Sequence, residues 1–288
     1  MKRLTTNTII ESLHFDDRMF RTLKGIEPLR KSDGRFRLTS GRHSVVFEAL
    51  WEGGHYGIKC YTWPQPLLAE VCDTLSLLPQ EFIIRPTPYA QELWVGDRYV
   101  DVVLYPWVEG HSLDREIRRA IHNRDREAFG QLLEEFCRLA LAILSSEWRH
   151  GDLKSENIIV RPDGTMALID CDALYSPGLE WRGEVGTPLF MHPERGDAYD
   201  SHIDDYAIAL ITCSLAALHL SPSLATGEGM VALPSEHKRG EIAALFGPSP
   251  ALLRLLDSLY LNDYRIDNLE ELLLCIIHKL LAPTKGPF

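Results

Sequence analysis

The sequence lacks several features that mark particular classes of protein. The first residues, MKRLTTNTIIESLHF, contain no apolar core of the length that a secretory signal peptide needs. No stretch is long and uncharged enough to span a bilayer, and the longest apolar candidate, residues 206–220, is typical of a buried helix. Internal repeats and low-complexity tracts are also missing. We therefore expect a cytoplasmic protein that has no membrane partner.

Paired cysteines and an excess of positive charge are missing as well. The six cysteines are scattered, mostly within apolar runs, and none forms a Cys-x-x-Cys pair. This argues against a zinc site or a disulfide framework and favours buried, reduced thiols. The 30 Lys and Arg residues are outnumbered by 41 Asp and Glu residues, giving a net charge of −11. Binding to nucleic acid or to an anionic membrane is therefore not expected.

What the chain does contain is a strand-rich first third. Its 288 residues are 45% hydrophobic and 25% charged, which is ordinary for a globular protein. Residues 36–61 favour three strands, and residues 67–78 have helical spacing. Residues 92–107 favour a hairpin that turns at Gly96 and Asp97.

The remainder of the chain has mainly helical patterns. Residues 126–144 place their apolar side chains on one face, as a core helix does. A short hairpin is expected over residues 157–170, and helices are expected from about residue 203 to the end. The layout is therefore a strand-rich part, a connector around residues 106–110 and a helix-rich part.

Polar groups gather at the segment HGDLKSENIIV, residues 150–160, just before a short apolar strand. Asp152 and Asn157 lie on this loop, and Asp170 ends the second strand of the hairpin that follows. Because a hairpin brings the end of its second strand back beside the start of its first, Asp170 should return to Asn157. Hard oxygen ligands of this kind suit Mg²⁺ that is shared with phosphates, and Lys154 adds a cation where phosphate charge develops.

This segment resembles the catalytic loop HRDLKxxN of eukaryotic-type serine/threonine protein kinases. The resemblance extends over about residues 35–285. Further matches follow in the order that the family has: Gly41 with Val46 in the glycine-rich loop, Lys59 in the third strand, Glu70 in helix αC, Asp170 in the DFG motif, residues 186–194 in GTxxYMAPE, Asp204 in the next helix and Arg265 near the end. Of the glycine-rich loop only Gly41 stands, since Thr39 and Ser44 replace the outer glycines.

The resemblance implies an α+β, bilobal protein-kinase fold. Its small antiparallel β lobe with one main helix would comprise residues 35–108, and its larger helical lobe residues 109–288. Residues 1–34 carry no catalytic motif and are expected to form an N-terminal extension with a structural or regulatory role. The sequence does not indicate the oligomeric state, so a regulatory partner or a dimer stays open.

The family's activity implies ATP and Mg²⁺ as cofactors and a protein Ser or Thr hydroxyl as acceptor. The implied ATP-binding residues are Lys59, Glu70, Gly41, Val46, Pro106 and Val108. In this scheme Lys59 holds the phosphates and is oriented by Glu70. The carbonyl of Pro106 and the N–H of Val108 would meet the adenine.

Catalytic and metal-binding roles are implied for the loop and the hairpin. Asp170 and Asn157 would bind Mg²⁺, Asp152 would orient the attacking hydroxyl, and Lys154 would offset charge on the γ-phosphate. His150 is expected to be a packed core residue. Structural roles are also implied for three residues outside the loop: Asp204 would organise its backbone, and Glu194 and Arg265 would form an ion pair.

The chain departs from the family at two catalytic motifs. Gly151 replaces the Arg of HRD, which normally pairs with a phosphate on the activation segment, so we expect activity that does not depend on phosphorylation there. DFG reads Asp170-Cys171-Asp172, and Asp172 is either a third metal ligand or, as we favour, a solvated turn residue.

Two alternatives to a protein kinase remain open. The sequence HGD also occurs in small-molecule kinases of the same fold, although Lys154, residues 186–194 and Arg265 resemble the peptide-binding parts of protein kinases. A pseudokinase that serves as a binding scaffold would explain the degraded glycine loop and the altered DFG motif. Against it, every charged group needed for Mg-ATP chemistry is present.

Overall fold

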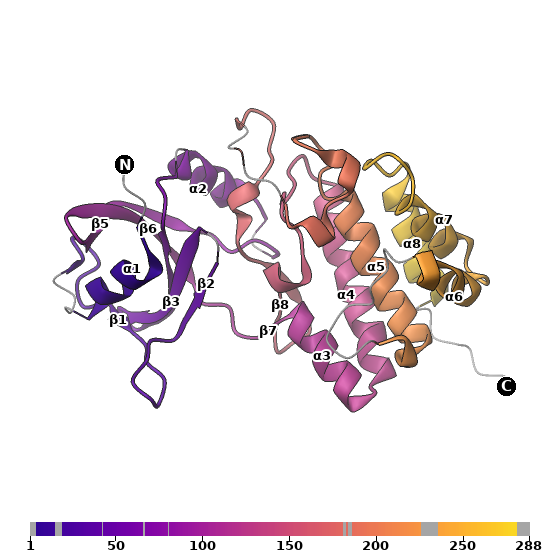
Figure 1. Cartoon of the computed structure of the whole chain (residues 1–288), viewed down its shortest axis with the longest axis horizontal. Coiled ribbons are helices and arrows are strands. Elements are labelled where there is room, and N and C mark those ends of the chain that lie inside the picture. The colour runs from indigo at the N-terminus through magenta and orange to yellow at the C-terminus, as the bar shows by residue number, and fades with distance from the viewer. Residues whose placement is uncertain are drawn as a thin grey trace. The chain divides into compact units, whose positions relative to one another are not determined.

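The computed structural model describes residues 4–14, 19–41, 43–65, 67–79, 81–180, 183, 186–225 and 236–280. The chain divides into two compact units, Met1–Val108 and Glu109–Phe288 (Figure 1). Mixed helices and strands build both units, and the first is dominated by a curled antiparallel sheet. The last residues of the predicted helical part, 281–288, lie outside the described ranges.

An antiparallel sheet forms the frame of the first unit. Its strands are β1 (Glu27–Pro28), β2 (Leu38–Ser40), β3 (Ser44–Trp51), β4 (Gly54–Tyr61), β5 (Thr87–Val95) and β6 (Arg98–Pro106). They follow the order β1-β3-β4-β6-β5, with β2 also paired to β3. The two-residue turn at Gly96 and Asp97 joins β5 to β6, as the sequence predicts. Glycine suits this turn because its φ is +64°.

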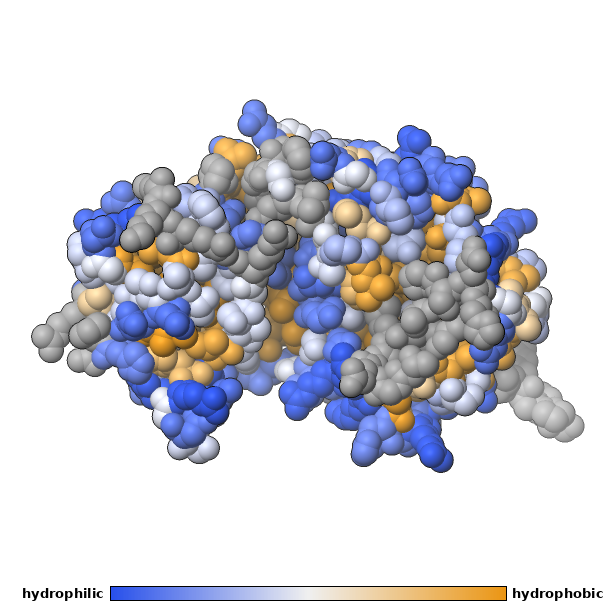
Figure 2. Space-filling view, in the orientation of Figure 1, coloured by the Kyte–Doolittle hydropathy of each residue, from blue (hydrophilic) through white to orange (hydrophobic). Residues whose placement is uncertain are grey.

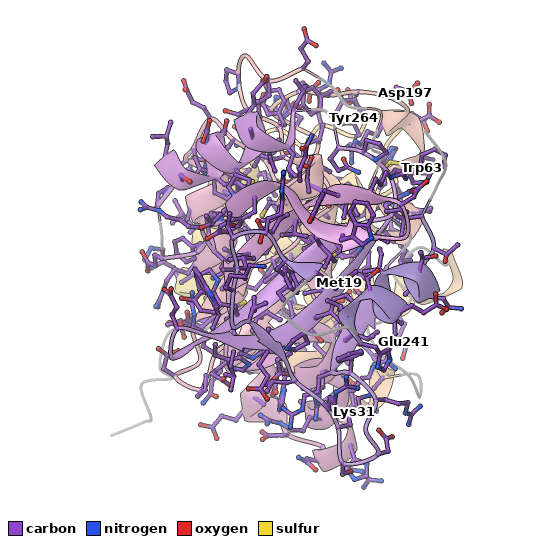
Figure 3. All side chains as sticks on the ribbon, turned by 90° about the vertical axis from the view of Figure 1, so that its left-hand side faces the viewer. Met19, Lys31, Trp63, Asp197, Glu241 and Tyr264 are labelled. Carbon is purple, nitrogen blue, oxygen red and sulfur yellow. The ribbon has the colours of Figure 1, made fainter. Side chains whose placement is uncertain are left out.

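Residues before position 35 contribute to the core of this unit. Helix α1 (Thr6–Leu13) begins at Thr5, whose hydroxyl accepts a hydrogen bond from the Thr8 N–H at 3.1 Å. Its Ile9 packs in one cluster with Phe20, Leu23 and the buried face of the sheet. The described residues of this segment therefore pack on the sheet of the first unit. The loop that follows β1 carries Lys31 (Figure 3).

The other face of the sheet carries the lysine that the kinase resemblance singles out. Successive side chains of a strand alternate between faces, so Ile58 and Cys60 enter the core while Lys59 points the other way. Lys59 lies opposite Val46 in the register of β3 and β4, and its ammonium is 5.2 Å from the centre of the Tyr61 ring. Helix α2 (Leu68–Leu77) packs on this side through Cys72, which contacts Tyr61 and Val103.

Helices make up most of the second unit. They are α3 (Leu113–Asn123), α4 (Arg126–Leu144), α5 (Asp205–Leu220), α6 (Glu236–Phe246), α7 (Pro250–Ser258) and α8 (Leu269–Leu280). A small sheet of β7 (His111–Ser112), β8 (Ile158–Val160) and β9 (Met166–Leu168) completes the unit, in the order β7-β8-β9. The predicted helix over 126–144 and the predicted hairpin after residue 157 are both formed.

Helix α5 lies at the centre of this unit and packs along α4 (Figure 1). It is buried on all sides from Asp205 to Leu218, as a helix with apolar residues all round must be. Within the described ranges, no helix has both the length and the apolar character that crossing a membrane requires. On the face drawn in Figure 2, hydrophobic side chains occur in separate groups among hydrophilic ones.

Candidate active site

The segment between α4 and β8 carries the polar residues that the sequence singles out. After Trp148 the chain crosses His150, Asp152 and Lys154 and enters a single 3₁₀ turn, Ser155–Asn157, that leads directly into β8. All these residues lie in the second unit, so their mutual geometry is fixed by that unit alone. We call residues 148–157 the polar loop.

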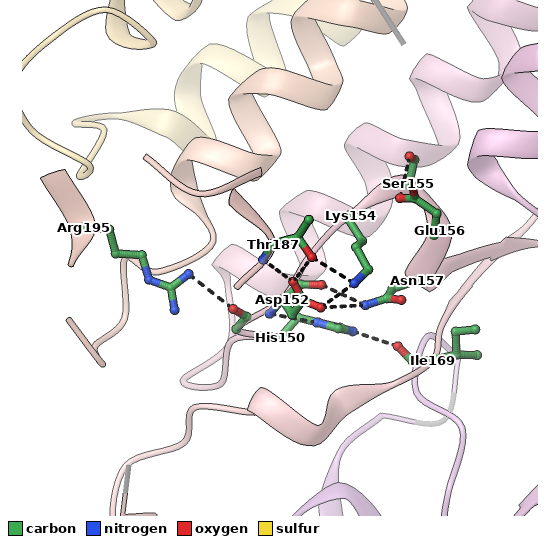
Figure 4. A network of polar contacts seen from close by, with 10 residues as sticks. His150, Asp152, Lys154, Ser155, Glu156, Asn157, Ile169, Thr187 and Arg195 are labelled. Carbon is green, nitrogen blue, oxygen red and sulfur yellow. Dashed lines mark hydrogen bonds and ion pairs between the residues drawn. The ribbon is translucent and has the colours of Figure 1, made fainter. Parts of the chain in front are cut away.

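Asp152 is the centre of a hydrogen-bond network (Figure 4). Its Oδ1 accepts from the N–H of Thr187 at 2.7 Å and from the hydroxyl of Thr187 at 2.8 Å. Its Oδ2 accepts from the Lys154 ammonium at 2.7 Å, with the Asn157 amide farther away at 3.4 Å. Both bonds to Oδ1 are short, so the remaining acceptor capacity of the carboxylate lies at Oδ2.

Lys154 joins the network to a segment 33 residues further along the chain. Its ammonium donates to Asp152 and, at 3.0 Å, to the hydroxyl of Thr187. The Asp152 and Lys154 side chains are 19% and 21% exposed, so the ion pair is partly screened but open on one side. Thr187, which lies in the segment that resembles GTxxYMAPE, therefore contacts the polar loop.

Asn157 and Asp170 come together through the β8–β9 hairpin. The amide nitrogen of Asn157 donates to the backbone carbonyl of Asp152 at 2.9 Å, which leaves its oxygen as a ligand atom. The N–H of Ile169 donates to the backbone carbonyl of Asn157 at 2.9 Å, so Asp170 follows directly beside Asn157. Asp170 has a φ of +62°, which is strained for a residue with a side chain and is common at functional sites.

One carboxylate and one amide oxygen at this position fit a magnesium ion. Mg²⁺ takes few ligands from protein and completes its shell with water and phosphate oxygens. Asp170 is exposed and therefore accessible to such an ion. Across the described part of the chain, no group of three or more His, Cys, Asp or Glu side chains is arranged to hold a metal by itself. A carboxylate and an amide oxygen are the hard donors available here.

His150 and Asp204 hold the backbone of the polar loop through hydrogen bonds to its N–H groups. Asp204 is 1% exposed, and its two oxygens accept from the N–H of His150 at 2.6 Å and of Gly151 at 2.9 Å. His150 is fully buried, and its Nε2 lies 2.9 Å from the carbonyl oxygen of Ile169. Its Nδ1 accepts from the N–H of Asp152 at 3.3 Å. Both residues have the structural roles that the sequence analysis assigns to them.

Gly151 stands where any larger residue would collide with the chain. Its φ is +82°, and a Cβ at this position would lie 2.0 Å from the carbonyl oxygen of Ala173. The arginine that the kinase motif carries here therefore has no room in this backbone arrangement. A glycine at this position allows the polar loop to pack closely against the segment after Asp170.

We expect Gly151→Ala to lower the free energy of unfolding by roughly 3 kcal/mol, because left-handed strain and a backbone collision add together. Gly178→Ala is the matched control, since Gly178 has a φ of +90° and nothing within 4 Å of an added Cβ. The control should lose only about 1 kcal/mol. Urea titrations of both variants measure the difference, and equal losses would show that the contact with Ala173 is unimportant.

The ion pair expected between Glu194 and Arg265 is not formed. Arg265 instead binds Asp263 with two hydrogen bonds of 3.1 Å, and burial of its side chain is slight at 56% exposure. Glu194 is exposed. Two residues apart, Asp263 and Arg265 satisfy each other locally, and this removes the need for a distant partner. The prediction was therefore wrong.

Two buried charges flank the start of α5. Burial lowers the pKa of Arg195, and the nearby carboxylates of Asp204, Asp152 and Asp200 partly offset this effect. Burial also raises the pKa of Asp205 to about 6, against hydrogen bonds from the N–H of Ile266 and from His202. The sequence analysis missed Arg195, because an arginine beside a glycine in a loop has the pattern of an exposed residue.

Of the residues implied for ATP binding in the first unit, Val46 lies opposite Lys59 on the same face of the sheet. Gly41 is in the turn between β2 and β3, and its N–H donates to the carbonyl of Ser44 at 2.9 Å. Lys59 is 2% exposed, whereas Glu70, in the first turn of α2, is exposed. No ion pair joins these two residues within the described ranges, so the expected orientation of Lys59 by Glu70 is not present.

The connector follows β6 directly. Pro106 is the last residue of β6 and lies opposite Tyr56 of β4. Val108 is the last residue of the first unit. Between them, the Trp107 N–H donates to the carbonyl of His55 at 2.9 Å, and its ring stacks on His55. A Cβ at Gly57 would be 3.8 Å from this indole and 3.3 Å from Val46. Trp107 therefore lies on the sheet face that carries Val46. The sequence did not indicate this position of Trp107.

A hollow is present elsewhere in the second unit. A cavity of about 700 Å³ opens between α3, α4 and the turn that joins β8 to β9. None of the candidate site residues lines it. The candidate site is thus defined by its hydrogen-bond network rather than by this cavity.

Comparisons with known proteins give one partial similarity. No protein-family model matches the chain. A stretch of 72 residues is 33% identical to the serine/threonine-protein kinase pakD of Dictyostelium discoideum, covering 23% of this chain and 4% of that protein. The chain therefore spans a small part of this relative's length. The similarity supports a relationship to kinases over part of the chain.

Proposed function

We propose that the chain is an ATP-dependent protein kinase that transfers the γ-phosphate of Mg-ATP to Ser or Thr hydroxyls. The observation that carries the proposal is the network in which Asp152 accepts from Lys154 and Thr187, while Asp170 directly follows Ile169, whose N–H bonds the carbonyl of Asn157. In this proposal the two units are the lobes of a protein-kinase fold. The partial similarity to a serine/threonine kinase supports the same reading.

The proposed chemistry assigns the acceptor hydroxyl to Asp152. Oδ2 is the oxygen with acceptor capacity left, so it would receive the hydrogen bond of the attacking hydroxyl and orient its oxygen. Lys154 stays within 2.7 Å of Oδ2 and would offset the charge that develops on the transferred phosphoryl group. Positioning and charge neutralisation supply most of the catalysis in phosphoryl transfer.

The remaining roles concern the nucleotide and the metal. Asp170 and Asn157 would hold Mg²⁺, which neutralises phosphate charge when bound. Lys59 would contact the phosphates, while Gly41 and Val46 would cover them and the base. Backbone groups of Pro106 and Val108 would meet the adenine. Glu70 does not pair with Lys59 in this structure. We therefore propose that Glu70 orients Lys59 only when nucleotide is bound.

The metal assignment is tested by Asp170→Asn. We expect this change to lower the transfer rate at least 100-fold at 1 mM Mg²⁺, because the carboxylate charge that holds the metal is lost. Partial recovery at higher Mg²⁺ is expected. Asp172→Asn is the matched control two residues away, and it should retain most of the activity if Asp172 is a turn residue. Equal losses in both variants would contradict the assignment of the metal to Asp170.

A small-molecule kinase is the second candidate, and two observations favour keeping it. The polar loop begins with His-Gly-Asp, and the Glu194–Arg265 pair that characterises a peptide-binding platform is not formed. Against it, Lys154 and Thr187 contact Asp152 as the protein-kinase pattern implies. An assay that offers casein and, separately, a set of amino sugars and amino alcohols distinguishes the two, because each candidate predicts label in only one acceptor class.

A further inference from the structure

Arg195 is a buried cation whose side chain bonds the polar loop and the residues just before α5. It is 7% exposed and comes from the 3₁₀ turn Pro193–Arg195. Its Nη1 donates to the carbonyl of Gly151 at 3.3 Å, which Figure 4 draws, and to the carbonyl of Ile203 at 3.4 Å. Its Nε has no hydrogen-bond partner among the described residues. A charged side chain with so few bonds is costly to bury and calls for a reason.

The guanidinium lies where the polar loop meets the segment that carries Thr187. A Cβ at Gly186 would be 3.1 Å from Nη1 of Arg195, 3.2 Å from the carbonyl oxygen of Gly151 and 3.7 Å from Oδ1 of Asp152. Gly186 therefore packs closely on Arg195, and an added Cβ would require the neighbouring atoms to shift by a few tenths of an ångström. The next residue, Thr187, makes the two short bonds to Asp152. Arg195 thus supports the junction through which Thr187 reaches Asp152.

Fixed negative charges surround this cation within the second unit. The carboxylates of Asp204, Asp152 and Asp200 all act on it, and Asp204 also holds the N–H groups of His150 and Gly151. His192, three residues before Arg195, is itself fixed. Its Nδ1 accepts from the N–H of Glu194 at 3.1 Å, and its Nε2 lies 2.9 Å from the carbonyl of Leu261. The backbone that carries Arg195 is therefore anchored at the start of the turn.

We propose that Arg195 is a positioning residue whose permanent charge holds the Gly186–Thr187 segment against the polar loop, so that Asp152 is oriented without phosphorylation of that segment. The catalytic consequence rests on the proposed kinase function. The holding role does not, because every contact that carries it belongs to the chain alone. Gly151 has no side chain that could bind a phosphate on this segment. In the proposal, the buried Arg195 holds the segment in place instead.

The use of a single nitrogen gives the proposal a sharp test. Both hydrogen bonds that Arg195 makes to described residues come from Nη1, so a lysine ammonium, although about one bond shorter, can replace much of its function. Methionine fills a similar volume and carries no charge. The proposal therefore predicts that Arg195→Lys retains the role and Arg195→Met loses it. A role in packing alone predicts the reverse order.

The experiment uses the full chain and measures two quantities for wild type, Arg195→Lys, Arg195→Met and the surface control Arg239→Met. The first is steady-state transfer from labelled ATP. We expect Arg195→Met to lower kcat about 100-fold with an unchanged KM for ATP, since misplacement of a reacting group by about 1 Å costs this much. Arg195→Lys should stay within about tenfold of wild type, and Arg239→Met should equal wild type.

The second quantity is hydrogen–deuterium exchange of peptides that cover residues 186–195, measured without nucleotide. It should be faster in Arg195→Met than in wild type, and Arg195→Lys should lie nearer to wild type. If Arg195→Met does not fold, as its melting curve will reveal, Arg195→Gln replaces it.

Each result decides the proposal. Methionine activity equal to or above that of lysine, or unchanged exchange in the methionine variant, would overturn it. If the wild-type chain transfers no phosphate, the proposed function fails, and the exchange data alone decide whether Arg195 holds the segment.

Discussion

Asp152→Asn should reduce phosphate transfer about 10³- to 10⁴-fold while leaving the chain folded. General acid–base catalysis by a positioned side chain contributes about 10²- to 10⁴-fold, and this substitution also removes the charge that pairs with Lys154. The asparagine oxygen can still accept from Thr187. Its NH₂ group, however, would face the Lys154 ammonium now 2.7 Å from Oδ2, and two donors repel one another.

The effect should appear in the chemical step rather than in nucleotide binding. Asp152 is not among the residues that the proposal assigns to ATP, so the rise in melting temperature on adding Mg-ATP should match that of wild type. Asp163→Asn is the matched control, because Asp163 lies exposed in the turn between β8 and β9, where its carboxylate accepts from the N–H and the hydroxyl of Thr165. A rate for Asp152→Asn within tenfold of the control would remove Asp152 from the catalytic role.

Asp204→Ala should lower the free energy of unfolding by about 3–5 kcal/mol, the range for removing one partner of a buried charged network. The change leaves the N–H groups of His150 and Gly151 without acceptors in a site that is 1% exposed. It also takes a counter-charge away from the buried Arg195. Each unsatisfied buried donor alone costs about 1–3 kcal/mol.

Two controls separate hydrogen bonding from charge at this position. Asp204→Asn keeps one acceptor oxygen and the shape of the side chain, so its loss should be smaller than that of Asp204→Ala. Asp257→Ala removes an exposed carboxylate that pairs with Arg239 and is 62% exposed, and its effect should stay within about 1 kcal/mol. Chemical denaturation of the four chains measures all three differences. A loss in Asp204→Ala no larger than in Asp257→Ala would contradict the supporting role of Asp204.

Much of the local structure follows from sequence patterns alone. The helix Arg126–Leu144 has the predicted bounds because its apolar residues recur at helical spacing on one buried face. The hairpin of β8 and β9 brings Asp170 back to Asn157, as the geometry of paired strands requires. The contacts of Asp204 and Thr187 with the polar loop agree with the positions that the kinase resemblance implies.

Other features depend on tertiary contacts that patterns do not report. Residues before position 35 have mixed composition, yet Ile9, Phe20 and Leu23 enter the core of the first unit because the sheet leaves one apolar face to cover. Arg265 is satisfied by its neighbour Asp263, a choice that spacing alone does not distinguish from a distant pair.

Burial of Arg195 is the least predictable feature. It results from the close approach of Gly151 and Gly186, two residues without side chains. The sequence signal that could have found it is the combination of a missing arginine in the polar loop with an extra one after the segment 186–194.

The most direct measurement is transfer of label from γ-labelled ATP to casein by the wild-type chain and by Asp152→Asn, with and without Mg²⁺, followed by identification of the labelled amino acid. The account predicts label on Ser or Thr that requires Mg²⁺, appears with wild type and is at least 10³-fold slower with Asp152→Asn. Binding of Mg-ATP by both chains with no label on any protein from either would contradict it.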